Sequence, residues 1–273
     1  MSTSEEQAER AEQDRNFEEA FNLWRRLALQ SPDEITFCRA GRAAQKAGRW
    51  MDAEEMFEEA LRIHPMSPEV IVCVGSLFLN RPDGEPAANL LRAKQSFLRA
   101  LKLDRTSASL ILLGCTYREL KDPASAKEAF NEALLLEPSN EEAYLNLALL
   151  SEDHDRSEAR GLYEKAIEID PNYAEAHQLM GVLLHKEGLL VEAEYHFRRC
   201  LEINPEDYMS HLYLANTLAV QGRFEEAEEV YRAAIALPQA DAAGFEFFAQ
   251  FLEDISRKED ANKIRAAKPT QAG

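Results

Sequence analysis

The stretch AEAHQLMGVLLHKEGLLVEAEYHFRRCLEINP, residues 174–205, contains a pattern that recurs along most of the chain. Ala193 is followed four residues later by the aromatic Phe197, and the stretch closes on Pro205. The pair of alanine and aromatic residue occurs seven times, at steps of 33, 40, 33, 33, 34 and 34 residues: Ala20/Trp24, Ala53/Phe57, Ala93/Phe97, Ala126/Phe130, Ala159/Tyr163, Ala193/Phe197 and Ala227/Tyr231. A nearly fixed period of this length indicates a repeat architecture.

Each period predicts two amphipathic helices joined by a short turn. Small side chains on both helices would let the two backbones approach closely, and the adjacent aromatic residue would fill the remaining groove. Enlarging such a site should cost about 1–3 kcal/mol through overpacking. The small residues expected on the first helices are Gly41, Gly75, Gly114, Ala148, Gly181 and Ala215, and the left-handed glycines expected between helices are Gly48, Gly188 and Gly222.

This pattern resembles the tetratricopeptide repeat, in which a bulky residue and Leu-Gly are followed by Ala, an aromatic residue, Ala and Pro over 34 positions. Two units match it well: Met180-Gly181, Gly188, Ala193, Phe197 and Pro205 in one, and Leu214-Ala215, Gly222, Ala227, Tyr231 and Pro238 in the next. The resemblance implies an all-α, right-handed superhelical α-solenoid of about eight helix-turn-helix repeats. Stacked neighbours would hide one another's apolar faces.

We expect a single solenoid over residues 1–268, followed by a disordered tail at 269–273. The expected units are approximately 1–33, 34–66, 67–106, 107–140, 141–173, 174–207, 208–240 and a capping unit 241–268. Three features depart from the repeat: a polar first helix, a 40-residue third unit, and a last unit that lacks its aromatic residue and proline. The third unit gains its length from an insertion at 80–86, either a solvated turn or a loop that contacts a ligand.

The composition excludes several classes of protein. The 273 residues include 31 Lys+Arg and 49 Asp+Glu, a formal charge of −18, which argues against binding to nucleic acid or anionic membranes. No apolar run is long enough to insert into a membrane. The four cysteines form no CxxC pair and are interpreted as small apolar fillers. A cytoplasmic protein with reduced thiols is expected.

No catalytic motif occurs in the sequence, which predicts a protein that is not an enzyme and needs no cofactor or metal. His177 and His211 occupy the same position in adjacent units, and either pack as structural residues or form a metal or proton-sensitive pair. The acidic turn Asp153-His154-Asp155 is either solvated or a loose cation site. Because no catalytic motif occurs, the function has to be inferred from the residues that the protein presents on its surface.

The family resemblance implies that the first helices line a concave, peptide-binding groove. Arg39, Arg42 and Lys46 would form its basic end, and the middle would be apolar, either exposed or partly packed against neighbouring helices. Glu253 and Asp254 would form an acidic end. The candidate residues are Arg39, Arg42, Lys46, Val72, Ile111, Leu112, Leu145, Asn146, Leu149, Leu179, Val182, Leu212, Tyr213 and Asn216.

Three functions fit these features. The first is a non-catalytic scaffold that binds a peptide or helix of a partner protein in the groove. The second is a chaperone or assembly factor that keeps an aggregation-prone client subunit soluble, with the acidic surface serving solubility. The third is self-association through an end or edge of the solenoid. The identity of the protein partner is not encoded in any motif.

Overall fold

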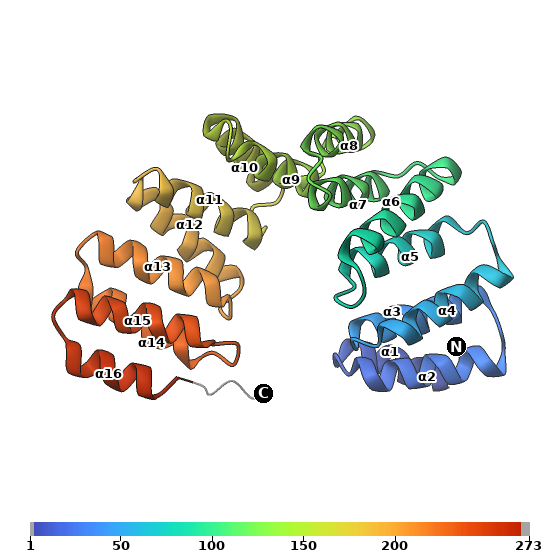
Figure 1. The fold of residues 1–273 in the computed structure, drawn as a ribbon, viewed down its shortest axis with the longest axis horizontal. Coiled ribbons are helices and arrows are strands. Elements are labelled where there is room, and N and C mark those ends of the chain that lie inside the picture. The colour runs from blue at the N-terminus through green and yellow to red at the C-terminus, as the bar shows by residue number, and fades with distance from the viewer. Residues whose placement is uncertain (1–2, 269–273) are drawn as a thin grey trace. The chain divides into compact units, whose positions relative to one another are not determined.

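A computed structural model describes residues 3–268, and within them the chain forms sixteen α-helices and no strand (Figure 1). The helices are α1 Thr3–Gln13, α2 Phe17–Gln30, α3 Glu34–Lys46, α4 Trp50–Ile63, α5 Pro68–Asn80, α6 Pro86–Leu103, α7 Ser107–Glu119, α8 Pro123–Leu136, α9 Glu141–Ser151, α10 Arg156–Ile169, α11 Ala174–Lys186, α12 Leu190–Ile203, α13 Tyr208–Val220, α14 Phe224–Ala236, α15 Ala242–Asp254 and α16 Lys258–Ala266. The all-α prediction is confirmed.

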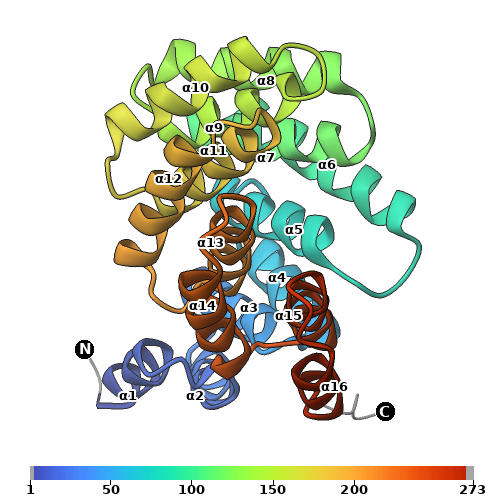
Figure 2. The same ribbon diagram turned by 90° about the vertical axis from the view of Figure 1, so that its left-hand side faces the viewer.

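The chain divides into two compact units, Met1–Ala143 and Tyr144–Gly273, and the boundary falls within α9. From α1 to α8 in the first unit and from α10 to α16 in the second, each helix packs against the next one along the chain. In the second unit, for example, α13 and α14 form one pair, and α15 and α16 form the next (Figure 2). This is the stacking of an α-solenoid. The expected tail, residues 269–273, lies outside the described residues.

Polar side chains and prolines determine where the helices begin. Asp33, Asp122 and Asp207 each accept a hydrogen bond from the backbone N–H three residues on, which satisfies a donor that the helix itself leaves unpaired. Proline occupies the first turn of α5, α6 and α8, where no N–H is needed. Between helices, Gly48, Gly188 and Gly222 have φ of 75°, 79° and 79°, which confirms their predicted left-handed conformation.

The predicted close approach of paired helices occurs at the glycines. A Cβ atom placed on Gly114 would lie 2.4 Å from the ring of Phe130, and one on Gly181 would lie 2.7 Å from the ring of Phe197. Both rings are fully buried. The aromatic residue therefore fills the space that the missing side chain leaves, as the repeat pattern predicted, and a larger residue at either glycine would collide with it.

The first helix and the insertion both differ from a simple repeat. α1 buries Ala8 and Ala11 against the core of the first unit, the two residues that its polar sequence offers for packing. At the insertion, α5 runs to Asn80 and α6 starts at Pro86, and α6 has 18 residues whereas α2, α4, α8, α10, α12 and α14 have 13 or 14. The extra residues of the third repeat, 67–106, therefore lengthen a helix as well as the turn.

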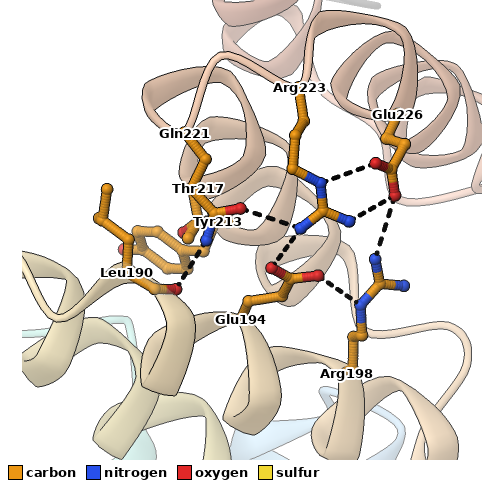
Figure 3. Close-up of polar contacts among 8 residues, drawn as sticks. All are labelled: Leu190, Glu194, Arg198, Tyr213, Thr217, Gln221, Arg223 and Glu226. Atoms are coloured by element: carbon orange, nitrogen blue, oxygen red, sulfur yellow. Dashed lines mark hydrogen bonds and ion pairs between the residues drawn. The ribbon is translucent and has the colours of Figure 1, made fainter.

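Ion pairs join successive helix pairs at their turns (Figure 3). Arg223, which precedes α14, donates to Glu226 of its own helix at 2.7 and 2.6 Å and to Glu194 of α12 at 2.5 Å. Arg198 reaches the same Glu194 at 2.9 Å. Two other arginines bond in the same way, to an acidic residue three positions on and to a glutamate of the preceding pair: Arg49 to Asp52 and Glu18, and Arg257 to Asp260 and Glu228.

Among residues 3–268, no helix combines the length and the apolar character that crossing a membrane requires.

Candidate functional site

Four of the predicted groove residues are buried, so their prediction as groove-lining surface is wrong. Ile111, Leu145, Asn146 and Leu212 are 2%, 3%, 4% and 7% exposed. Leu145 and Leu212 belong to the hydrophobic core of the second unit. The side chains at these positions turn inward to fill the core, and a substitution such as Leu145→Glu would therefore unfold the protein rather than test binding.

The remaining apolar candidates are half-buried and serve mainly in packing. Leu149, Leu179, Val182 and Tyr213 lie against the core of the second unit, and Tyr213 stacks on Phe197 with ring centroids 5.6 Å apart. In the first unit, the half-buried Val72 and Leu112 pack against the cluster around Phe97. Each of these residues offers only one edge to solvent, which leaves Asn216 as the exposed member of the predicted set in the second unit.

The predicted basic residues border a hollow of about 460 Å³ in the first unit. We call it the charged hollow; its lining is Glu9, Glu12, Gln13, Arg39, Arg42, Ala43 and Lys46. Arg39 donates to Glu9 at 2.6 Å and lies over the ring of Trp24 at 4.7 Å, while Lys46 lies over Phe17 at 5.2 Å. The three basic residues predicted to lie together do border one hollow. The α1 carboxylates of Glu9 and Glu12 lie beside them and partly neutralise their charge.

A second hollow, of about 340 Å³, lies in the second unit between α13, α14 and α15. We call it the aromatic hollow; its lining is Asn216, Ala219, Val220, Phe224, Tyr231, Phe247, Gln250, Phe251, Asp254 and Ile255. Val220, Phe224 and Phe247 are 61%, 43% and 57% exposed, and all three border this one concavity. An apolar concavity with large exposed side chains is typical of a binding site.

Stacked rings form the rigid base of the aromatic hollow. Tyr231 contacts Phe248 and Phe251 with ring centroids 5.3 and 5.2 Å apart, and Phe224 lies 6.3 Å from Phe251. These rings come from α14 and α15, so the packing that holds the last two helix pairs together also shapes the hollow. Burial and the charge of Asp254 raise the pKa of Tyr231 to about 12, so this ring stays neutral at physiological pH.

Sequence analysis missed the aromatic hollow because its parts come from different repeats. Of its lining, Asn216 was predicted as a groove residue and Asp254 as part of the acidic end. Phe224 follows directly after the turn glycine and its arginine, where the other units also place a large residue, such as Trp50. The signal that could have revealed the site is the excess of phenylalanine in 245–251 over what one helix can bury.

The histidines and the acidic turn have structural partners. His177 contacts His196 of its own helix pair, with the two Nδ1 atoms 3.0 Å apart, whereas His211 lies 3.0 Å from the carbonyl of Pro205. Asp155 caps α10 by accepting from the N–H of Glu158 at 2.9 Å. No group of three or more His, Cys, Asp or Glu side chains in the described part of the chain is placed to hold a metal ion.

The stacked helix pairs and their glycine–aromatic seams define an α-solenoid with two surface hollows. The sequence matches four models described as tetratricopeptide repeat, at residues 38–108, 107–140, 162–195 and 184–247. The chain belongs to the tetratricopeptide repeat family, as the sequence pattern indicated. Repeats of this family typically serve as non-catalytic scaffolds for protein interaction.

A solved structure shows a similar fold, and two others match with lower scores. The structure described as the functional characterization of Pseudomonas aeruginosa PilF is 20% identical in sequence, with a TM-score of 0.64 over 81% of this chain and 97% of that chain. Two structures of MamA are 23% and 18% identical, with TM-scores of 0.48 and 0.49, and cover 61% and 70% of this chain and 95% of those chains. No curated protein matches the sequence.

Proposed function

We propose that the protein is a non-catalytic scaffold that binds a short segment of a partner protein, a peptide or an amphipathic helix, through the aromatic hollow of the second unit. The observation that carries the proposal is the exposure of Val220, Phe224 and Phe247 around one concavity. Water contact with these side chains is unfavourable, and a partner that covers them regains that free energy.

The size of the hollow limits what it can receive. A volume of about 340 Å³ suits one or two bulky side chains rather than a folded domain. Burying one such side chain contributes about 1.5–3 kcal/mol. A micromolar complex needs about 8 kcal/mol after the cost of association, so the partner segment must also contact residues beyond the hollow. Gln250 and Asp254, which are exposed at its rim, offer polar contacts.

Charge favours a basic partner segment. Residues 144–273 contain 24 acidic and 13 basic side chains, a formal charge of −11. Lys or Arg beside the inserted apolar side chain would be attracted to this unit and would associate faster at low salt. The partner that fits best therefore carries a bulky apolar residue within one or two turns of basic residues.

Selection from a random peptide library tests this function, with the full chain immobilised. We expect the selected peptides to combine a bulky apolar residue with Lys or Arg, and their affinity to fall at least about tenfold for Phe247→Ser, the loss of roughly 1.4 kcal/mol. The control is Leu135→Ser on α8, which removes an apolar side chain that is 83% exposed and lies outside the hollow. Equal binding by the Phe247→Ser and Leu135→Ser proteins would contradict the proposal.

The chaperone alternative uses the same exposed apolar surface but predicts a different result. A client-holding protein would suppress the aggregation of an unfolded client at an equimolar ratio, and the suppression would depend little on Phe247 alone. A scaffold for one segment would bind its selected peptide and leave aggregation unchanged. Light scattering of a reduced, unfolding test protein separates the two functions.

A further inference from the structure

Two cysteines that are far apart in the sequence lie in contact in the first unit. Cys38 is on α3 and Cys73 is on α5, the first helices of neighbouring pairs, and their Sγ atoms are 3.7 Å apart. Both thiols are half-buried, so small molecules can reach them while larger reagents are hindered. Both cysteines pack against the core of the first unit, as their interpretation as small apolar fillers expects, and in addition their sulfur atoms are in contact.

We propose that Cys38 and Cys73 form an oxidation site at which a hydroperoxide converts the two thiols into an intramolecular disulfide. The bond would link two successive helix pairs of the first unit and tie α3 to α5. The site is independent of the aromatic hollow, because both cysteines belong to the first unit.

The geometry requires only a small movement. A disulfide has its sulfur atoms about 2.05 Å apart and its Cβ atoms about 3.5–4.5 Å apart. The thiols, at 3.7 Å, must therefore approach by about 1.7 Å. We expect rotation about the two Cα–Cβ bonds, with a slight shift of α3 against α5, to supply this approach.

The surroundings favour one thiol as the nucleophile. The hydrogen bond shared with Cys38 and, to a smaller extent, the positive charge of Arg42 lower the pKa of Cys73, against the opposing effect of burial. The same hydrogen bond, together with burial, raises the pKa of Cys38. Thiolate is the reactive form of cysteine, so Cys73 attacks first and Cys38 follows.

The reaction balances with one hydroperoxide. The Cys73 thiolate attacks one peroxide oxygen, the O–O bond breaks, and the product is a sulfenic acid together with a hydroxide or alkoxide that takes up a proton. The Cys38 sulfur then attacks the Cys73 sulfur, the S–S bond forms, and the S–O bond breaks. The departing hydroxide leaves as water with the proton from Cys38. The thiols lose two electrons in total, and the hydroperoxide gains them.

The other two cysteines provide internal references. Cys200 is buried, accepts a hydrogen bond from Ser210 at 3.1 Å, and has its pKa raised by burial. It should therefore react slowly. Cys115 is half-buried on α7 and borders a different hollow, next to Leu112. Neither residue has to be altered for the pair to be followed.

Peptide mapping of the full-length protein tests the proposal. The reduced protein is treated with increasing amounts of hydrogen peroxide, alkylated, and digested without reductant. We expect a linked peptide pair containing Cys38 and Cys73, two hydrogens lighter than the separate peptides, and loss of both thiols together about tenfold faster than loss of the Cys200 thiol. Dithiothreitol should reverse the change, and the thermal unfolding midpoint of the oxidised protein should rise by several degrees.

Variants identify the order of events and keep the test independent of folding defects. Cys38→Ser should leave Cys73 as a sulfenic acid that dimedone traps, whereas Cys73→Ser should slow the oxidation of Cys38. The Cys115→Ser/Cys200→Ser double variant should form the same link as the wild type. Oxidation of Cys38 and Cys73 to sulfinic acids without a link, or a link between two chains instead of within one, would overturn the proposal. Both results are read from the wild-type protein itself.

Discussion

The two hollows of the molecule are bordered by residues of opposite character. In the charged hollow, the guanidinium of Arg39 is paired with Glu9 and covers the ring of Trp24, whose Nε1–H in turn donates to Glu12 at 2.8 Å. In the aromatic hollow, Phe224 and Phe247 are 43% and 57% exposed. Arg39 in the charged hollow therefore already has a carboxylate partner, whereas the rings at the aromatic hollow are open to solvent.

This difference is the reason for proposing the second unit as the surface that a partner binds. An acidic ligand that pairs with Arg39 would have to displace the Glu9 carboxylate, so this new ion pair would replace an existing one and add little free energy. An apolar side chain in the aromatic hollow would replace only water. The comparison favours the second unit as the binding surface, although the sequence had placed a basic end in the first.

The largest expected effect is a difference in stability between a buried ring of the aromatic hollow, Phe251, and an exposed one, Phe247. Phe251 is buried among three other rings, so Phe251→Ala should lower the free energy of unfolding by about 3–5 kcal/mol. Phe247→Ala removes a mostly exposed ring and should change it by no more than about 0.5 kcal/mol. Urea unfolding followed by circular dichroism measures both. Equal costs would mean that Phe247 is a packing residue and not available to a partner.

Acid should destabilise the second unit before the first. Burial, with repulsion from His177 and Arg160, lowers the pKa of His196 to about 4 from an ordinary value of 6.5, and burial lowers the pKa of His177 as well. The unfolded chain therefore takes up protons below about pH 6.5 that the folded chain refuses until about pH 4, so stability falls as the pH drops between these values.

Hydrogen exchange resolved by peptide, between about pH 7 and pH 4.5, measures the effect on each unit. His196→Gln keeps a polar side chain without the titrating group and should flatten the pH dependence of the second unit. Acid-induced opening that begins in α3–α5 would contradict this ordering.

The smallest expected effect tests whether the carboxylate of Glu9 keeps acidic ligands from binding Arg39 in the charged hollow. Glu9→Gln removes the carboxylate that Arg39 binds and should lower the free energy of unfolding by only about 0–1 kcal/mol. It should also let the hollow attract a glutamate-rich peptide that the wild type ignores, and added salt should abolish this binding. Fluorescence polarisation of the labelled peptide measures the gain. If the acidic peptide binds the wild type as well as it binds the Glu9→Gln protein, the Glu9 carboxylate does not block the charged hollow, and the proposed difference between the two hollows is wrong.

The sequence predicted the features that each helix pair determines by itself. The spacing of Ala193 and Phe197 fixes two helices and their seam, and Gly188 fixes the turn between them, because these contacts lie within one repeat. Contacts between neighbouring helix pairs were harder to predict. Whether a residue such as Leu145 or Leu212 faces solvent depends on how closely the next first helix packs, and a repeat pattern gives that spacing only on average.

The missed sites share this physical cause. Cys38 and Cys73 differ by 35 positions, one more than the 34-residue period, and only the observed packing of α3 against α5 places their sulfur atoms in contact. Phe224 and Phe247 belong to different repeats, and each alone is an ordinary surface residue. A site assembled from two repeats follows from the packing of helices rather than from the pattern in either one.

Nuclear magnetic resonance of the full chain with a library-selected peptide tests the central claim most directly. Selective labelling of valine methyl groups and phenylalanine rings reports separately on the lining of the aromatic hollow. The account predicts that the largest shifts on peptide addition fall at Val220, Phe224 and Phe247, while the side chains of Arg39, Arg42 and Lys46 stay unchanged. Shifts centred on the charged hollow, with the three apolar residues unaffected, would contradict it.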